Sequence, residues 1–380
     1  MATERIAAEA RECGFPLAGA APLGVLERAP FVERWLAEGR AGEMGYLARR
    51  MAERMDPRTA FPWARSIVSL AYPYRPPPPP AGDWRAELRG RIAAYALGTD
   101  YHELVGELLE RLIARLDDVF PGARFRRYVD TGPVLEREWG ARAGLGWIGK
   151  NTLVLHRTAG SYFFLAELLT DLALDAVPLP ADHCGTCTRC ITACPTGALD
   201  GYAMDPRRCI SYLTIEHRSA IPVALRPQLD NWVFGCDRCQ EACPWNRDER
   251  DAAGFEELSP RLPPLLALDA AGFQARFGRT AVARAKRRGL LRNVAVVFGN
   301  SGNRDAVPAL VGALGDVEPL VRGHAAWALG EIGRRARAGE APRPAVAAAL
   351  GRACADLDPS VQDEAVRALA TLGDGGAGGS

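Results

Sequence analysis

The segment DHCGTCTRCITACPTGAL, residues 182–199, decides the fold of this chain, because it gathers four cysteines in the spacing C-x2-C-x2-C-x3-C-P. The first three thiolates of this spacing line one tight loop and can reach three irons of a 4Fe–4S cubane. The fourth cysteine, which precedes Pro195, is turned away and ligates the other cluster in two-cluster ferredoxins. The segment therefore predicts iron–sulfur chemistry and a partner motif elsewhere in the chain.

The partner motif is CDRCQEACPWN, residues 236–246, which has the same Cys-Pro ending but lacks one leading cysteine. Cys209 fills that gap, and the eight cysteines then divide into two sets of four with none left over. The first set is Cys184, Cys187, Cys190 and Cys243, and the second is Cys194, Cys209, Cys236 and Cys239. The spacing predicts one 4Fe–4S cluster for each set.

Zinc is the alternative metal for these thiols. The pairs Cys187/Cys190 and Cys236/Cys239 would suit tetrahedral thiolate coordination. Two Cys-Pro endings and two reciprocal x3 spacings are not required by zinc, and they are typical of a protein with two clusters. The pattern therefore favours iron–sulfur clusters over zinc.

Composition is that of an ordinary globular protein. The chain has 380 residues, of which 48% are hydrophobic and 24% charged, and this length allows two or three domains with buried cores. The formal net charge of +1 means that attraction to an acidic partner has to come from local charge. No export segment or membrane-spanning apolar run is apparent, so we expect a cytoplasmic protein whose clustered thiols bind metal.

The first 180 residues alternate strand-like and helix-like segments. SIVSLAYPY (66–74) and RFRRYVD (124–130) predict strands, and HELVGELLERLIARLDDVF (102–120) has apolar residues at helical spacing. We predict an α/β cofactor domain over residues 1–180. A ferredoxin-like module with two clusters is expected to follow over residues 181–250.

The C-terminal part contains an internal repeat. Residues 316–333 and 356–373 match at an offset of 40 residues, with Asp, Pro, Val, Ala, Leu and Gly in the same register. A two-helix unit of this length is the period of a HEAT repeat. We predict an α-helical HEAT-like domain over residues 251–375, in which 290–302 resembles the second helix of one more unit.

A basic stretch precedes the repeat, because residues 273–304 contain eight Lys or Arg and no acid. A solvated helix face is the usual explanation of such a run. A nucleic-acid phosphate backbone is the other, and the absence of compensating acids in this stretch favours it. The predicted contacts are Lys286, Arg287, Arg288 and Arg292.

The segment DYHELVG, residues 100–106, is a near match to a corrinoid motif. It has one residue too many for D-x-H-x-x-G, which supplies a histidine to cobalt in some corrinoid proteins. At the start of a helix, His102 is predicted to be a cap or a local hydrogen-bonding residue instead of a metal ligand.

The order of these motifs resembles the epoxyqueuosine reductase family over about residues 5–335. The resemblance rests on DYH (100–102), YVDTGPVLEREWGARAGLGWIGKNT (128–152), CISYLTIEHRSAIP (209–222), the two cysteine motifs and the basic HEAT-like tail. It implies an oxidoreductase that uses cob(II)alamin and two 4Fe–4S clusters. The implied reaction reduces epoxyqueuosine at the wobble position of tRNA to queuosine and water, with two electrons and two protons.

The resemblance also implies site residues and partners. The proton donor would be the aspartate of VDTGP, here Asp130, which would also contact the cobalamin. Tyr95, Lys150, Asn151 and Ser211 match positions near the corrinoid pocket. Burial against the corrin would raise the pKa of Asp130 toward the pH at which it donates. The implied partners are tRNA carrying epoxyqueuosine and an external electron donor, and we expect a monomer that does not bind membranes.

Two other functions fit part of the sequence. A corrinoid reductive dehalogenase also combines cobalamin with two clusters, but it would usually carry an export signal and has no need for a basic repeat tail. A ferredoxin-like electron carrier with a HEAT interaction tail would not need about 180 residues of α/β domain ahead of its clusters.

Overall fold

In the computed structural model, the chain forms two compact units. Unit 1 comprises residues 1–76, 99–209 and 237–251, and unit 2 comprises residues 77–98, 210–236 and 252–380. The structure describes residues 2–74, 76, 82–246, 255–336 and 341–373. Both units contribute residues to the segment 181–250, and the domain boundaries at 180 and 250 stay predictions.

A four-stranded antiparallel sheet forms the centre of unit 1. Its strand order is β1 (Leu17–Pro22), β2 (Ser66–Pro73), β7 (Phe163–Thr170) and β4 (Phe125–Tyr128). The strands predicted from the sequence at 66–74 and 124–130 are confirmed as β2 and β4. Successive side chains of each strand point to opposite faces, so the sheet offers two surfaces for helices.

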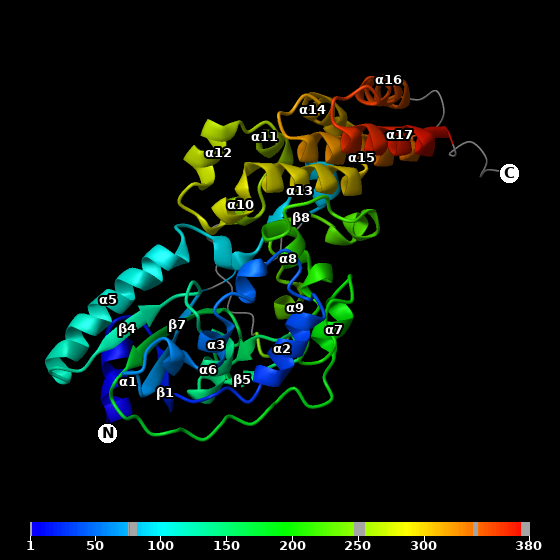
Figure 1. Cartoon of the computed structure of the whole chain (residues 1–380). Helices are drawn as coiled ribbons and strands as arrows, with labels where there is room; N and C mark the ends of the chain where they lie inside the picture. Colours follow the sequence, from blue (N-terminus) through cyan, green and yellow to red (C-terminus); the bar gives the residue numbers. More distant parts are fainter. Residues whose placement is uncertain (1, 75, 77–81, 247–254, 337–340, 374–380) are drawn as a thin grey trace. The chain divides into compact units, whose positions relative to one another are not determined.

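Helices α1 (Ala2–Glu12) and α5 (Tyr101–Val119) cover one face of this sheet (Figure 1). The amphipathic helix predicted in this region is confirmed, and its apolar side lies in a buried core shared with β2 and β7. The Asp100 carboxylate caps α5 by accepting the backbone N–H of His102 at 3.0 Å. This cap fixes where α5 begins, and therefore where Tyr101 and His102 lie.

Helix α6 (Glu136–Arg142) covers the opposite face. Trp139 is fully buried there and packs in one cluster with Leu169 of β7. The C-terminal end of α6 approaches β1 at Gly19, where a Cβ would lie 1.9 Å from the carbonyl oxygen of Ala143. This close approach, which only glycine permits, holds α6 and the loop before it against the sheet.

The other helices and strands of unit 1 are short. They are α2 (Ala29–Ala37), α3 (Met51–Met55), β5 (Trp147–Ile148), β6 (Val154–Leu155), α7 (Arg189–Ala193) and α9 (Arg238–Glu241). Strands β5 and β6 pair as an antiparallel ribbon. Helices α7 and α9 carry cysteines of the two motifs.

Unit 2 contains the predicted repeat. Helices α14 (Val307–Ala313) and α15 (Pro319–Arg335) form one helix pair, and α16 (Arg343–Ala353) and α17 (Pro359–Gly373) form the next (Figure 1). Helix α13 (Lys286–Ser301) precedes them as the additional second helix predicted from the sequence. The HEAT-like architecture is therefore confirmed.

The remaining helices and strands of unit 2 are also short. They are α4 (Trp84–Glu87), β3 (Arg91–Ile92), α8 (Ile210–Ile215), β8 (Trp232–Phe234), α10 (Phe255–Leu258), α11 (Leu262–Leu266) and α12 (Ala270–Phe277). Strands β3 and β8 pair in parallel. No helix in the described ranges is long and apolar enough to cross a membrane.

An arginine–aspartate contact recurs between successive helix pairs. Arg287 of α13 forms an ion pair with Asp316, and Arg322 of α15 donates two hydrogen bonds of 2.7 Å to Asp356. Each aspartate also accepts a backbone N–H at the start of the next second helix. The repeated aspartate thus has a structural role, and Arg287 is bound within the repeat array.

Arg292 is fully buried in α13. Its guanidinium donates hydrogen bonds of 2.6 to 2.8 Å to the carbonyl oxygens of Leu213, His217 and Ser219. The prediction that Arg292 contacts nucleic acid is therefore wrong, because its side chain satisfies backbone acceptors inside unit 2. Lys286 and Arg288 are the exposed members of the predicted basic set.

Replacing Arg292 with Ala should lower the free energy of unfolding by about 3 kcal/mol, because three backbone acceptors lose their donor. Urea denaturation followed by circular dichroism would measure this loss. Arg288→Ala removes the same charge from an exposed position of the same helix, and it should change the free energy by less than about 0.5 kcal/mol. Equal effects of the two substitutions would contradict a structural role for Arg292.

Candidate active site and cluster sites

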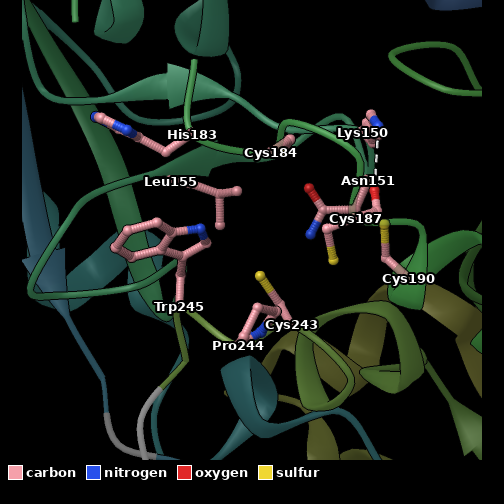
Figure 2. Close-up of a pocket in the computed structure, with 10 residues that line it drawn as sticks. All are labelled: Lys150, Asn151, Leu155, His183, Cys184, Cys187, Cys190, Cys243, Pro244 and Trp245. Carbon is pink, nitrogen blue, oxygen red and sulfur yellow. Dashed lines mark hydrogen bonds between the residues drawn. The ribbon is translucent and has the colours of Figure 1, made fainter. Parts of the chain in front are cut away.

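The cysteines of the first predicted set line a cavity of about 340 Å³ in unit 1 (Figure 2). Cys184 and Cys187 lie in the loop before α7, Cys190 lies in its first turn, and Cys243 follows α9. Figure 2 shows Cys187, Cys190 and Cys243 around one space. Four thiols around a space of this volume suit a cluster of several atoms.

Lys150 holds the cysteine loop of this cavity. Its ammonium group donates hydrogen bonds to the carbonyl oxygens of Gly185 at 2.6 Å and Cys187 at 3.1 Å. The same positive charge lies among the residues that line the cavity, where it would stabilise the negative charge of thiolate ligands. Lys150 therefore both positions the loop and supplies charge to the site.

Asn151 lies beside Lys150 and is buried. Its Oδ1 accepts the backbone N–H of Leu153 at 3.2 Å. Its Nδ2 has no hydrogen-bond partner among the described residues, although the side chain lines the cavity (Figure 2). A buried donor of this kind fits a bound cluster or cofactor that would accept its hydrogen bond.

Three cysteines of the second set lie in unit 1. The Sγ of Cys194 accepts the backbone N–H of Ala198 at 3.3 Å. Burial raises the pKa of the Cys239 thiol, and the Cys209 thiol raises it further. Such a thiol ionises readily only when a cation compensates its charge, as cluster iron does. Cys236, the fourth member, ends the segment 210–236 of unit 2.

Asp130 lies in the loop between β4 and α6. Its φ of 56° is in the left-handed region, which costs a residue other than glycine roughly 1–3 kcal/mol. Its backbone N–H donates a hydrogen bond to the Glu136 carboxylate. Its side chain is 62% exposed. The loop therefore holds a strained backbone and presents the carboxylate to solvent, and the burial expected on corrinoid binding stays a prediction.

Two side chains at the start of α5 face the Asp130 carboxylate. The Tyr101 hydroxyl donates a hydrogen bond of 3.0 Å to Oδ2, and His102 Nε2 lies 3.6 Å from the same oxygen. His102 Nδ1 lies 2.7 Å from Asp100 Oδ1. The nearby carboxylate of Asp130, and then that of Asp100, raise the pKa of His102 although burial opposes the shift. The prediction of a local hydrogen-bonding role for His102 is confirmed.

Two further acids lie behind the Asp130 loop and were not found from the sequence. Glu136 is the first residue of α6, and Glu167 lies fully buried in β7. Burial raises the pKa of both carboxyls, and that of Glu136 reaches about 7. The signal for Glu167 is an acid inside the otherwise apolar strand FFLAELLT, residues 163–170.

The other predicted corrinoid residues lie in unit 2. Tyr95 lies in a short 3-10 turn, and Ser211 is the second residue of α8; both are partly buried. Asp130, Lys150 and Asn151 lie in unit 1. A corrinoid site shared by these five residues stays a prediction.

Three family models match the chain. Residues 183–246 match a 4Fe-4S double cluster binding domain, residues 54–131 match epoxyqueuosine reductase QueG, DUF1730, and residues 280–370 match HEAT repeats. These matches confirm the prediction of an N-terminal α/β part, a ferredoxin-like part with two 4Fe–4S clusters and a HEAT-like tail. The zinc alternative is not supported.

Solved structures of the same class are similar to the whole chain. An epoxyqueuosine reductase from Streptococcus thermophilus is 28% identical with a TM-score of 0.86, and the match covers 97% of this chain and 99% of that one. A complex of epoxyqueuosine reductase with an epoxyqueuosine-modified tRNA-Tyr stem loop is 29% identical, with a TM-score of 0.85 and coverage of 97% and 98%. The fold therefore matches theirs over 97% of this chain.

Curated relatives agree with these structures. The epoxyqueuosine reductase of Pseudomonas aeruginosa is 42% identical over 335 residues, which cover 84% of this chain and 91% of the relative. That of Escherichia coli K12 is 38% identical over 334 residues, which cover 84% and 86%. On these matches, the chain belongs to the epoxyqueuosine reductase family.

Proposed function

We propose that Asp130 is the proton donor of a reaction in which this protein reduces epoxyqueuosine in tRNA to queuosine. The family membership supports the reaction. The observation that carries the residue assignment is the exposed Asp130 carboxylate, which lies against Tyr101 and His102. A related Bacillus subtilis enzyme, 28% identical, has an aspartate catalytic loop that swings out of its active site, and we infer that residues 129–133 are the same loop here.

The reaction sets a proton requirement. It breaks both bonds between the epoxide oxygen and carbon, forms a carbon–carbon double bond and releases the oxygen as water. This consumes two electrons and two protons. Cob(II)alamin, when bound, supplies a redox-active metal centre for electron transfer to the epoxide, and the two 4Fe–4S clusters hold the electrons that arrive singly from an external donor.

The residues around Asp130 supply the protons. Asp130 gives the first proton to the departing oxygen, and burial of its carboxyl in the loaded site would supply the raised pKa that this role requires. The carboxylates of Asp130 and Asp100 raise the pKa of His102, which favours its protonated imidazole, and its Nε2 lies 3.6 Å from Asp130 Oδ2. His102 therefore returns a proton to Asp130, which delivers the second one. Tyr101 keeps the carboxylate oriented through its hydroxyl.

The two cysteine sets and the predicted corrinoid residues account for the cofactors. The eight cysteines of the two sets hold the two clusters. Tyr95, Asn151 and Ser211, with Asp130 and Lys150, would hold the cobalamin, and the unpartnered Nδ2 of Asn151 is one free donor for it. Because both carbonyl contacts of Lys150 go to the cysteine loop, we assign it mainly to holding that loop.

The substrate is tRNA, as in the related complex with a modified stem loop. We assign phosphate contacts to Lys286 and Arg288, which are exposed, and not to Arg292, which is buried. An external electron donor, a monomeric state and a cytoplasmic location complete the proposal. A dehalogenase or an electron carrier fits less well, since curated relatives over 84% of the chain are epoxyqueuosine reductases.

Asp130→Asn should reduce single turnover of epoxyqueuosine tRNA by at least about a hundredfold, because the amide cannot donate a carboxyl proton. The wobble nucleoside would be read by mass after anaerobic reconstitution with and without cobalamin. Iron content and tRNA affinity should stay at the wild-type level.

Asp118→Asn is the matched control, because it changes an exposed acid of α5 that contacts none of these groups. It should retain full turnover. Full activity of Asp130→Asn would remove Asp130 from the proton-donor role, and cobalamin-independent turnover by the wild type would remove the cofactor from the proposal.

The double substitution Lys286→Ala/Arg288→Ala should weaken tRNA binding and reduce the slope of log affinity against log salt by about 1 to 2, since each lost phosphate contact removes somewhat less than one unit. Filter binding at several salt concentrations would measure the slope. Arg5→Ala/Arg11→Ala removes the same charge from exposed positions of α1 and should leave the slope unchanged. An unchanged slope in Lys286→Ala/Arg288→Ala would contradict the assignment of phosphate contacts to these two residues.

A further inference from the structure

A polar row crosses the sheet of unit 1 beneath α6. Ser69 of β2 is the register partner of Glu167 of β7, and Glu167 is the register partner of Tyr128 of β4. Cross-strand partners share one face of a sheet, and this face is the one that carries Leu169 and packs on α6. Glu167 is 0% exposed, so a carboxyl group lies inside an apolar layer.

Among the described residues, no N–H or O–H group donates a hydrogen bond to either carboxyl oxygen of Glu167. The carboxyl of Glu136 lies beside it, within reach of a carboxyl–carboxyl hydrogen bond. Two carboxylates have no hydrogen to share, so such a contact requires a proton on one of them. Full burial places that proton on Glu167, and Glu136 accepts it as a hydrogen bond.

Glu136 also contacts the catalytic loop directly. Its carboxylate accepts the backbone N–H of Asp130, whose φ of 56° is strained for a side-chain-bearing residue. A strained backbone persists only where surrounding contacts hold it. A hydrogen bond from an N–H to a charged carboxylate is one of the stronger contacts that can do so.

We propose that Glu136 and Glu167 form a one-proton carboxyl pair that latches the Asp130 loop: Glu136 holds the loop through the Asp130 amide, and protonated Glu167 holds Glu136. Both are positioning residues, because neither touches the reacting atoms. The proposal rests on the assignment of Asp130 as proton donor for its effect on turnover. The latch itself depends only on the contacts of unit 1.

The groups that face the pair determine its response to pH. They are Asp130 from the loop, Arg137 from α6, Tyr128 from β4 and Ser69 from β2. Burial raises the pKa of Glu167, and the charges of Glu136 and Asp130 raise it further. Arg137 lowers that of Glu136 in part. The pair therefore keeps at least one proton at neutral pH and loses it on the alkaline side.

The sign of the effect on stability follows from this shift. A carboxyl whose pKa is raised in the folded state binds its proton more tightly there than in the unfolded chain. Its stabilising contribution is complete below the ordinary pKa and is lost as the pH rises through the raised one. Loss of the proton from Glu167 leaves two buried carboxylates side by side, and their repulsion would release the loop.

The first test measures the latch without turnover. In hydrogen–deuterium exchange at neutral pH, Glu136→Ala should exchange the amides of residues 129–132 at least about tenfold faster than the wild type, as loss of a charge-assisted hydrogen bond implies. Glu136→Gln should restore most of the protection, because its amide oxygen still accepts the Asp130 N–H. Glu138→Gln changes a neighbouring acid of α6 that pairs with Arg142, and it should exchange like the wild type.

The second test follows the proton. Protection of the amides of residues 129–132 against exchange, corrected for the intrinsic exchange rate, should fall on the alkaline side of neutrality in the wild type, and Glu167→Gln should lack this fall, because its amide donates to Glu136 and cannot lose a proton. Infrared spectra should show a protonated-carboxyl band in the wild type that Glu167→Gln lacks. Glu138→Gln should keep both the fall and the band.

Each result decides one part of the proposal. Unchanged loop exchange in Glu136→Ala, or equal acceleration in Glu138→Gln, would overturn the latch. A persistent alkaline fall or carboxyl band in Glu167→Gln would overturn the shared proton. Absence of turnover in the wild type would instead overturn the proposed function, and the exchange and infrared comparisons would still decide the latch.

Discussion

Convergence of cysteines from two separate motifs is the constraint on which the architecture depends. The first set needs Cys243 to reach the loop that carries Cys184, Cys187 and Cys190, and all four line one cavity of unit 1 (Figure 2). A loop with few regular elements holds such a geometry only if its backbone is fixed from outside. Lys150 does this through two carbonyl oxygens, so it contributes to the cluster site by hydrogen bonds to the backbone of the loop as well as by its charge.

The parts of the fold that could be predicted from the sequence are those set by local spacing. The cysteine motifs, the 66–74 strand, the amphipathic α5 and the 40-residue repeat each carry their signal within one segment. The proximity of Glu136 and Glu167 has no such local signal in the sequence, because it depends on β7 lying beside β4 and beneath α6. An acid in an apolar strand could have been noted, but its partner is set only by the tertiary fold.

The basic stretch shows that the charge of a surface, too, depends on tertiary contacts that the sequence does not reveal. The absence of acids over residues 273–304 suggested an unbalanced surface, yet Arg284 pairs with Glu216 at 2.8 Å and Arg287 with Asp316, and the Arg292 guanidinium binds backbone carbonyls. Glu216 and Asp316, which are distant in sequence, therefore neutralise part of the positive charge of this stretch. Counting charge along a segment therefore overstates the charge available to tRNA, because folding directs some arginines into the protein.

Asp130 is held from two sides by different kinds of contact. Helix α5 contacts its side chain through Tyr101 and His102, whereas α6 contacts its backbone through Glu136. The side chains that face its carboxylate, Tyr101 and His102, are thus separate from Glu136, which binds its backbone N–H. In the position seen here, the loop keeps both kinds of contact, one at its backbone and one at the Asp130 carboxylate. The proposed proton supply of Asp130 is thereby linked to this position of the loop, in which Nε2 of His102 lies 3.6 Å from Oδ2.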